Sequence, residues 1–510
     1  MAVRFVVNGK RVEVESVDHH VTLLAWLRTV GLTGSKEACA EGECGACAVA
    51  VVASDAAGRT RFDPINSCLV PLPAVHGRTV VTVEGVAPGP GELHPVQREM
   101  VVAGGSQCGY CTPGFVVSLF CEYYRPGRSG TDPEAISGNL CRCTGYRPII
   151  DVARRLAPPQ PGDPRLDELA VAPAPLGPVD HEHVHAYEHA PGHAHAQAPA
   201  PAPVQGRQRF VRPTDLPSLL RLLSEDPQAI AIAGGTDLMV YANQRYERFP
   251  VLAAVDAIPE LARFEVTPSE VVIGAGLTLT AVEERTSSSG DDPGALAIPM
   301  LRQLFPLFSS RLIRNRATLG GNLATASPIG DAAPALLALG AEVTLAARDG
   351  ARRIPLADLF VGYRKTALRP GEVIVSIHVP RPLSRHQRFY KVSKRVLDDI
   401  STVAAAFALD LGADGRVERL RIAYGGVSAT PLDATAPVGA LAVGRPWDRE
   451  TLAVLLDAVG PVGTPLSDHR GSAAYRRAMM GRLLEKLFAE TASPPPAGSA
   501  FARDEGRAPA

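Results

Sequence analysis

The first 85 residues combine strand-like and helix-like patterns. Apolar and polar residues alternate over residues 5–14 around an Asn-Gly pair, and this pair favours the type I′ turn of a β-hairpin. Apolar residues at helical spacing predict a helix over residues 21–30. Short apolar runs predict further strands at 48–53 and 78–83. We therefore expect a small mixed sheet with one helix.

Helical periodicity dominates residues 86–158. Two helices are expected, over residues 112–124 and 147–156, because each stretch has a proline beside its first residue, where the missing N–H costs nothing. Each stretch follows a pair of cysteines. The partial positive charge at a helix N-terminus stabilises thiolates, so the two cysteine pairs are expected to meet where the helix ends converge.

Residues 159–205 are rich in proline, alanine and histidine and have no hydrophobic period. This composition is typical of a flexible linker, partly extended where prolines cluster. The histidines allow a second interpretation, a metal-binding tract, although a solvated linker of biased composition is the simpler one. These histidines are His181, His183, His185, His189, His193 and His195.

Folded patterns resume near residue 206. Strands and short helices alternate at first, and the last folded unit has two strand signals followed by two helical stretches. The Pro/Ala/Gly-rich end is predicted to be disordered. We therefore expect a multidomain α+β protein whose parts are residues 1–85, 86–158, 159–205, 206–383, 384–490 and 491–510.

Composition excludes several classes of function. The 510 residues carry a net charge of −1, which gives no reason to expect nucleic acid or an anionic membrane as a partner. No apolar run approaches the length of a transmembrane helix, and the first residues lack the layout of a signal peptide. A soluble cytoplasmic protein is therefore expected.

Eight of the nine cysteines form two sets of four. The first set, Cys39-x4-Cys44-x2-Cys47-x20-Cys68, has the spacing of plant-type ferredoxins, which bind a [2Fe–2S] cluster. In a reducing compartment, clustered cysteines are more often metal ligands than disulfide partners. Glycines within the loop allow the tight backbone turns that bring three ligands to one small object.

The second set is Cys108-x2-Cys111-x29-Cys141-x-Cys143. Its first pair alone would also suit a zinc half-site or a redox dithiol. The one-residue spacing of the second pair is unusual for a zinc ribbon, and the neighbouring first set favours a second iron–sulfur cluster. Cys121, the remaining cysteine, lies among apolar residues and is expected to be buried and unliganded. Two clusters close together indicate electron transfer.

Two glycine-containing stretches are candidates for binding a phosphorylated cofactor. Gly234-Gly235-Thr236-Asp237 lies between a predicted strand and a predicted helix, where loop N–H groups and the helix end can bind pyrophosphate. On its own this motif is also compatible with a simple turn. The second stretch, residues 317–331, is richer in small residues and in hydroxyl and amide side chains.

Three segments resemble a known family. Residues 41–47, 106–114 and 138–148 are similar to the iron–sulfur signatures of molybdenum hydroxylases, which include xanthine dehydrogenases and aldehyde oxidases. The resemblance continues through the flavin region and leaves out the linker and the tail. It implies a β-grasp ferredoxin-like domain, a helical [2Fe–2S] domain, a two-part FAD-binding domain and a C-terminal α+β flavoprotein domain.

The resemblance also implies roles for individual residues. Gln107 and Cys143 match residues that approach the pterin of a molybdenum cofactor. Phe308 matches an aromatic residue near the flavin ring, although core packing would explain it equally well. Lys391 matches a flavin contact, and the alternative is a surface lysine. The candidate FAD contacts are Gly234, Gly235, Thr236, Asp237, Phe308, Thr318, Gly321, Asn322, Thr325, Ser327, Asp331 and Lys391.

For this chain the resemblance implies an electron relay. Electrons would pass from a molybdenum centre through the second cysteine set, then the first set, then FAD, and finally to NAD+. The family's molybdenum domain is much larger than anything after residue 490. A separate large subunit is therefore expected to carry the molybdenum cofactor, in a heterotetramer with two copies of each chain. No residue here is expected to act as an acid or base on the substrate.

Three functions stay open at this point. Both clusters and the flavin on one chain favour a subunit of the xanthine dehydrogenase type, which oxidises hypoxanthine and xanthine to urate in purine catabolism. The first alternative is the equivalent subunit of a molybdenum hydroxylase that acts on aldehydes or N-heterocycles. The second alternative, outside this class, is a zinc-stabilised nucleotide-binding module.

Overall fold

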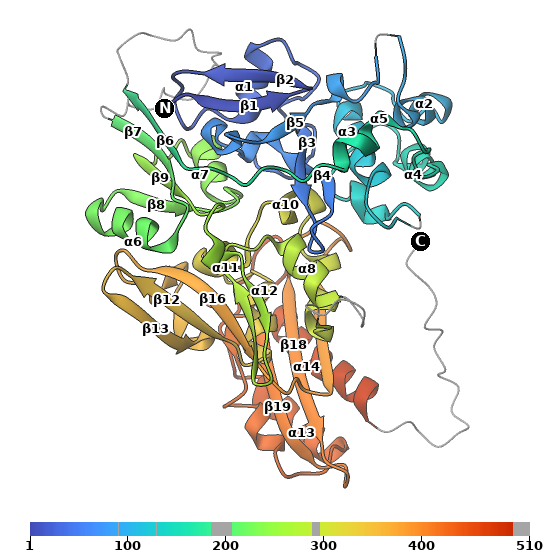
Figure 1. Cartoon of the computed structure of the whole chain (residues 1–510). Helices are drawn as coiled ribbons and strands as arrows, with labels where there is room; N and C mark the ends of the chain where they lie inside the picture. The colour runs from blue at the N-terminus through green and yellow to red at the C-terminus, as the bar shows by residue number, and fades with distance from the viewer. Residues whose placement is uncertain (90, 129, 185–206, 288–295, 493–510) are drawn as a thin grey trace.

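The computed structural model describes residues 1–89, 91–128, 130–184, 207–287 and 296–492. The N-terminal domains form one end of an elongated molecule, and the C-terminal sheet with its helices forms the other (Figure 1). The predicted flavin region lies between these ends (Figure 1). The cysteine-bearing domains are therefore adjacent to the flavin region.

The N-terminal domain is a five-stranded sheet, in the order β2-β1-β5-β3-β4, with one helix. The predicted hairpin is confirmed: Asn8 and Gly9 have φ of 49° and 77°, as a type I′ turn requires. Leu23, Leu24 and Leu27 of the predicted helix are buried in the core beside the sheet. The elements are β1 (Val3–Val7), β2 (Lys10–Val14), α1 (Leu23–Thr29), β3 (Ala48–Ser54), β4 (Thr60–Asn66) and β5 (Thr79–Val81).

The helical domain shares a core with strands β3 and β4. Phe62 of β4 contacts Phe120 of α3, with ring centroids 4.9 Å apart, and such a pair contributes about 0.5–1.5 kcal/mol beyond its buried area. The small side chains of Ala48 and Ala50 on β3 let α3 pack closely on the sheet. The helices are α2 (Pro95–Val102), α3 (Thr112–Tyr123) and α4 (Arg147–Arg155). Both helices predicted after cysteine pairs are therefore present.

The predicted linker contains regular structure, which corrects the sequence-based interpretation. Helix α5 (Pro164–Leu169) and strand β6 (Val179–Val184) lie within it, and β6 pairs antiparallel with β7 (Arg207–Arg212). His181 is buried, and its two ring nitrogens lie 2.8 Å from the carbonyl oxygens of Met1 and Val17. His181 is thus a packed core residue. The last four histidines of the tract, from residue 185 on, lie outside the described residues.

The flavin region is built from two larger sheets and the two-stranded sheet β14-β15. The first, in the order β6-β7-β9-β8, has parallel β7, β9 and β8, and the second, β10-β11-β16-β12-β13, is antiparallel. The elements of the first part are α6 (Leu216–Glu225), β8 (Ala229–Ile232), α7 (Leu238–Gln244) and β9 (Val251–Ala254). Those of the second part are β10 (Phe264–Val266), β11 (Glu270–Gly274), α8 (Leu279–Ser287), α9 (Pro299–Leu304), α10 (Arg311–Arg314), α11 (Leu319–Ala324), α12 (Ala332–Ala338), β12 (Glu342–Ala347), β13 (Gly350–Pro355), β14 (Phe360–Gly362), β15 (Lys365–Thr366) and β16 (Val373–Pro380).

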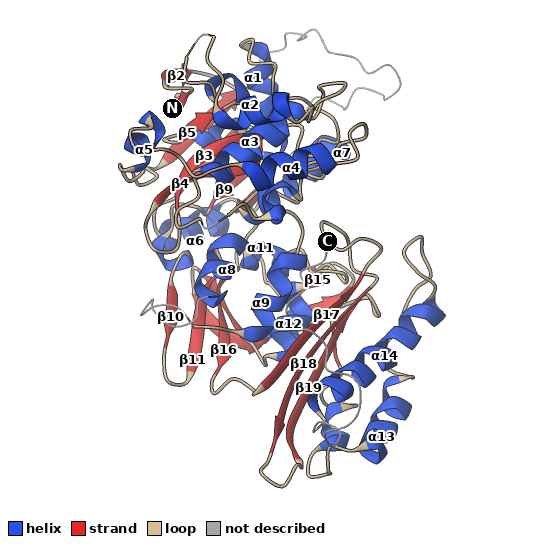
Figure 2. Cartoon of the chain, turned by 90° about the vertical axis from the view of Figure 1, so that its right-hand side faces the viewer, coloured by secondary structure: helices blue, strands red, loops and turns tan. Residues whose placement is uncertain are grey.

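The C-terminal sheet is covered on both faces, by α13 and α14 on one and by α9 and α12 on the other (Figure 2). Strand β18 shows why: Val403 and Phe407 face the core on the α14 side, whereas Ala404 and Ala406 face the flavin-region core. The alternation of a strand places successive side chains on opposite faces, and alanine lets α12 approach closely. The elements are β17 (His386–Val392), β18 (Val403–Leu411), β19 (Val417–Gly425), β20 (Leu432–Asp433), α13 (Arg449–Val459) and α14 (Ala473–Thr491).

Helix length and polarity bear on any membrane role. Within the part of the chain that the structure describes, no helix is both long enough and apolar enough to span a bilayer.

His19 joins the N-terminal domain to the flavin region. Its Nε2 lies 2.7 Å from the carbonyl oxygen of Phe249, and burial, assisted by His20, lowers its pKa to about 4. The unfolded chain binds this proton more readily than the folded one, so stability is full above about pH 6.5 and falls as the pH drops toward 4, by about 3 kcal/mol. We expect urea unfolding midpoints to show this fall and His19→Gln to reduce it.

The exposed His469 provides the matched control. His469→Gln removes a histidine without removing a buried one, so its midpoints should follow the wild-type profile over the same pH range. An equal flattening in both variants would contradict a specific role for His19.

Candidate functional site

The four cysteines of the first set converge. Cys39, Cys44 and Cys47 lie in the loop between α1 and β3, and Cys68 lies just after β4. The sulfurs of Cys47 and Cys68 lie 3.4 Å apart, and the thiols of Cys39 and Cys44 are hydrogen-bonded to each other. The charge of Cys39 acts on the pKa of both Cys47 and Cys68, so the four thiols form one group. The structure thus brings together all four members of the set.

Two of these four thiols are shifted toward the thiolate, the form that binds iron: the pKa values of Cys39 and Cys47 are lowered, whereas those of their partners Cys44 and Cys68 are raised. The thiol of Cys44 and the backbone N–H groups of Glu41, Glu43 and Cys44 lower the pKa of Cys39 to about 5, against the opposing effect of burial. Asn66 stabilises the loop because its Nδ2 donates to the carbonyl of Gly42 over 2.7 Å. Four sulfurs and several inward N–H donors are the chemistry that a [2Fe–2S] cluster requires, and the residues fit it.

The loop of the first set packs directly on the second set. Leu140 N–H donates to the carbonyl of Cys44 over 3.0 Å. A Cβ on Gly45, whose φ is +64°, would lie 2.3 Å from the carbonyl oxygen of Gly138. Glycine is therefore required at this contact for both backbone conformation and space. The two cysteine sets are joined by a backbone hydrogen bond between Cys44 of the first set and Leu140, the neighbour of Cys141 in the second.

This close approach predicts the effect of Gly45→Ala. The methyl group would force the Cys44 loop away from Gly138, so we expect iron and visible absorbance to fall together. Gly58→Ala is the matched control, since Gly58 also has positive φ, +79°, but nothing lies within 4 Å of its Cβ position. That change should cost only about 1–2 kcal/mol of unfolding free energy and leave the iron content intact. Full iron content in Gly45→Ala would contradict the argument.

The second cysteine set lies at the molecular surface. Cys108 and Cys143 are exposed and hydrogen-bonded to each other, and Cys111 pairs with Cys141. The hydroxyl and N–H of Thr144 lie 3.1 and 3.4 Å from the sulfur of Cys141; burial alone would raise the pKa of Cys141, but these contacts lower it to about 7. All four predicted members are thus together, and this donor set also fits a cluster.

The residues beside the second set differ in exposure, according to whether they face the surface or the core of the helical domain. Gln107, predicted to face a pterin, is exposed next to Cys108. Helix α3 begins directly after Cys111, which is its N-cap residue. Cys121, in the middle of α3, is buried and packs in the apolar core, as predicted.

The two predicted phosphate-binding stretches meet in space. Thr325 Oγ1 donates to Asp237 Oδ2 over 3.2 Å, and a Cβ on Gly234 would lie 2.1 Å from the carbonyl oxygen of Arg316. Helix α7 begins directly after the first stretch. Helix α11 lies within the second stretch, and Thr318 caps it by accepting from Gly321 N–H. Neighbouring helix N-termini offer unpaired N–H groups to an anion, so this corner suits a pyrophosphate.

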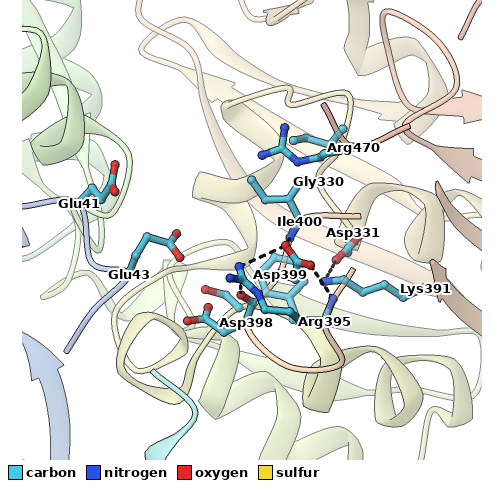
Figure 3. A pocket seen from close by; sticks show the side chains of 13 residues that line it. Glu41, Glu43, Gly330, Asp331, Lys391, Arg395, Asp398, Asp399, Ile400 and Arg470 are labelled. Atoms are coloured by element: carbon cyan, nitrogen blue, oxygen red, sulfur yellow. Dashed lines mark hydrogen bonds and ion pairs between the residues drawn. The ribbon is translucent and has the colours of Figure 1, made fainter. Parts of the chain in front are cut away.

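A cavity of about 420 Å³ separates the first cysteine loop from the flavin region. Glu41 and Glu43 approach it from the N-terminal domain, and Arg395, Asp398 and Asp399 face them from the C-terminal part (Figure 3). This volume lies within the range of ligand pockets. An aromatic cofactor ring placed here would adjoin the loop that carries Cys39 and Cys44.

Three predicted flavin residues, Phe308, Asp331 and Lys391, line this cavity. Lys391 Nζ lies 2.8 Å from Asp331 Oδ2 (Figure 3). It also lies 2.6 Å from the carbonyl oxygen of Leu307. Its side chain is 2 % exposed, so the alternative of a surface lysine is wrong. Phe308 is buried in the flavin-region core and borders the cavity, so core packing and contact with a cofactor are compatible.

Sequence reasoning missed several residues of this cavity. Glu41 and Glu43 were treated only as part of the cysteine loop, although their position beside the ligands was a usable signal. Burial, with the charge of Asp398, raises the pKa of Glu43 to about 7, and burial raises that of Asp398 to about 6. Arg470 reaches the cavity from the segment before α14, and no local pattern announces this.

Four family models match successive parts of the chain. Residues 5–72 match "2Fe-2S iron-sulfur cluster binding domain", and residues 82–154 match "[2Fe-2S] binding domain". Residues 205–382 match "FAD binding domain in molybdopterin dehydrogenase", and residues 388–491 match "CO dehydrogenase flavoprotein C-terminal domain". Both cysteine sets lie in iron–sulfur families, which counts against zinc. With the observed fold, these matches confirm the predicted multidomain α+β class.

The proteins that this chain resembles include enzymes of different named activities. The chain is 32 % identical to a xanthine dehydrogenase of Emericella nidulans over 474 residues, covering 85 % of this chain and 34 % of that protein. It is 32 % identical to aldehyde oxidase 4 of Cavia porcellus over 528 residues, covering 95 % and 39 %. The chain thus spans between a third and two-fifths of these curated relatives. A solved CO dehydrogenase from Oligotropha carboxidovorans is 30 % identical with a TM-score of 0.50, covering 55 % of this chain and 96 % of that one.

Proposed function

Because the chain belongs to the molybdenum hydroxylases and carries their iron–sulfur and FAD-binding domains, we propose that it is the electron-transfer subunit of a xanthine dehydrogenase in the cytoplasm. The observation that carries the proposal is continuity. The exposed second cysteine set, the Leu140–Cys44 backbone contact, and the cavity beside Glu41 form one uninterrupted sequence of neighbours. Electrons move faster through several short steps between neighbouring centres than through a single long step.

The proposal assigns a role to each group of residues. When bound, two [2Fe–2S] clusters supply one-electron carriers, and FAD supplies a centre that accepts single electrons and releases a hydride. The protein holds the first cluster with Cys39, Cys44, Cys47 and Cys68, and the second with Cys108, Cys111, Cys141 and Cys143. The flavin contacts are Gly234, Gly235, Thr236, Asp237, Phe308, Thr318, Gly321, Asn322, Thr325, Ser327, Asp331 and Lys391.

A separate molybdenum-bearing chain is part of the proposal, in a heterotetramer with two copies of each subunit. The exposure of Cys108 and Cys143 beside Gln107 supports a partner at this face, because a cluster that receives electrons from another chain must lie near the surface. NAD+ is the proposed acceptor, and hypoxanthine and xanthine are the proposed substrates of the partner.

Purification of the native complex tests this function. We expect a larger molybdenum-containing chain to accompany this one, and xanthine or hypoxanthine to drive NADH formation. Bleaching of the cluster and flavin absorbance on addition of xanthine, followed by recovery on addition of NAD+, would show that the electrons pass through this chain. An iron-free or flavin-free preparation, from cells that assemble clusters normally, would refute the role.

A second candidate is the equivalent subunit of an aldehyde-oxidising or N-heterocycle-oxidising enzyme. The 32 % identity to aldehyde oxidase 4 across 95 % of this chain supports it. The same preparation separates the two: rapid bleaching by aldehydes or quinoline, with none by xanthine, would favour the second candidate. Recovery with oxygen alone would replace NAD+ as the acceptor.

A further inference from the structure

A second cavity, of about 240 Å³, lies between the N-terminal domain and the flavin region. Val51 and Arg78 border it from the N-terminal sheet, Asp256 and Arg316 from the flavin region, and Leu176 from the segment before β6. It shares no lining residue with the cavity beside Lys391. Its volume falls below the range of about 300–1000 Å³ typical of organic ligands, so its occupant is small.

Arg78, Arg316 and Asp256 border this cavity, and the buried Arg212 also contacts Asp256. Arg78 Nη2 lies 2.6 Å from Asp256 Oδ2, and Arg212 Nε lies 2.9 Å from Asp256 Oδ1. Arg212 is completely buried and also donates to the carbonyls of His76 and Ala74, over 3.1 and 2.7 Å. Both carboxylate oxygens of Asp256 are therefore already paired, one with Arg78 and the other with Arg212.

Arg316 is the third arginine, and its charge lacks a partner. Its Nε donates to the carbonyl of Gly234 over 3.3 Å. Across the described ranges, neither Nη of Arg316 donates to a carboxylate or a carbonyl. Burial and the nearby Arg78 lower its pKa to about 10, and Asp256 offsets this only in part. The guanidinium stays charged at neutral pH.

The charges opposite do not supply the missing partner. Arg61 borders the same cavity, but Asp63 lies 2.6 Å from its Nε and Glu284 also pairs with it. That side holds one arginine against two carboxylates, so it has no positive charge to spare and no carboxylate bonded to Arg316. Although burial would raise the pKa of Asp256, the three arginines hold it at about 2, so this carboxylate is ionised. The three arginines exceed it by two charges, and the extra carboxylate beside Arg61 leaves a net excess of one positive charge.

We propose that this cavity binds a small inorganic oxyanion, of the size and charge of phosphate or sulfate, between Arg316 and Arg78. Arginine is the side chain best suited to oxyanions, because its planar fork donates paired hydrogen bonds. The anion would balance the excess charge where the iron–sulfur and flavin parts of the chain meet. The inference is independent of the proposed enzyme function.

Calorimetric titration of the purified, FAD-loaded protein with inorganic phosphate tests the site. At fixed ionic strength, set with chloride, we expect saturable binding of one phosphate per chain and a higher midpoint of thermal unfolding. Arg316→Gln should weaken phosphate binding by roughly tenfold or more, because it removes a charged donor. Arg263→Gln, at an exposed arginine, removes the same charge and should change the affinity less than about twofold.

Several outcomes would overturn the proposal. Absence of saturable binding by the wild-type protein would mean that water alone fills the cavity. Equal affinity in Arg316→Gln would place the phosphate elsewhere. Because Thr318 borders this cavity and belongs to the proposed flavin set, FAD-free protein is titrated as well. Binding that FAD abolishes would assign the cavity to the cofactor's own phosphate.

A crystallographic arm covers the case in which Arg316→Gln does not fold. Crystals of the wild-type protein soaked in selenate should show anomalous selenium density within hydrogen-bonding distance of Arg316. Density only at other sites would refute the assignment. Each readout is independent of catalysis, so a failed anion site and a failed enzyme function are distinguishable.

Discussion

Cys44→Ala is expected to halve the iron content, from about four to about two atoms per chain, and to disconnect the flavin from the substrate. Cys44 interacts with Cys39 in the first set, and a cluster cannot be held there by three thiolates alone. We expect the rate of flavin reduction by substrate to fall more than roughly 100-fold, the upper limit for loss of a supporting contact. Iron analysis and rapid-mixing absorbance measure both effects.

Cys121→Ala is the control for this experiment. Cys121 is a buried cysteine that lies ten residues beyond Cys111 along α3 and packs in the apolar core. Its replacement should cost at most about 1 kcal/mol of unfolding free energy and leave the iron and the rate unchanged. If Cys121→Ala lost iron, or if Cys44→Ala kept all of it, the proposed ligand assignment would be wrong.

Lys391→Met is expected to destabilise the protein by about 3–5 kcal/mol and to lower its FAD content. Lys391 and Asp331 form an ion pair whose side chains are 2 % and 7 % exposed. Removing one member of a buried pair leaves the other charge unpaired in a site of low polarity, and this produces a loss of that size. Denaturant unfolding and the flavin-to-protein absorbance ratio measure the two effects.

Two further variants make this result specific. Lys394→Met removes an exposed lysine of the same segment and should change the unfolding free energy by less than about 0.5 kcal/mol. The double variant, Lys391→Met with Asp331→Asn, removes both charges and should recover part of the lost stability. Equal effects of Lys391→Met and Lys394→Met would show that the buried pair has no special importance.

Local patterns predicted the hairpin, the first helix and the helices after the cysteine pairs in the two N-terminal domains. The hairpin at Asn8-Gly9 and the helix after Cys111 were predictable because a turn type and a helix start depend on neighbouring residues. The cysteine sets were predictable for a similar reason, since ligand spacing is itself a sequence property. What the spacing does not give is the contact between the sets, because the Leu140–Cys44 hydrogen bond joins distant segments.

Strand β6 shows where such patterns fail. Its alternation places Val179 and His181 inward, but a histidine counts as polar in any hydrophobic pattern, so the strand resembles a linker. Its hydrogen bonds to β7 form across a long intervening segment. The same limitation applies to the cavity beside Lys391, because Glu43 and Arg470 reach it from opposite ends of the chain. Only tertiary packing reveals these neighbours.

The two-sided packing of strand β18 determines how the last two units of this protein unfold. Ala404, Ala406 and Ala408 belong to the core of the flavin region, whereas Val403, Ala405, Phe407 and Leu409 belong to the core of the C-terminal unit. The boundary drawn near residue 384 therefore does not separate two independent cores. A fragment cut there would expose the apolar face of β18 to water and would tend to aggregate. The last two units should therefore melt in a single calorimetric transition and resist separation by mild proteolysis.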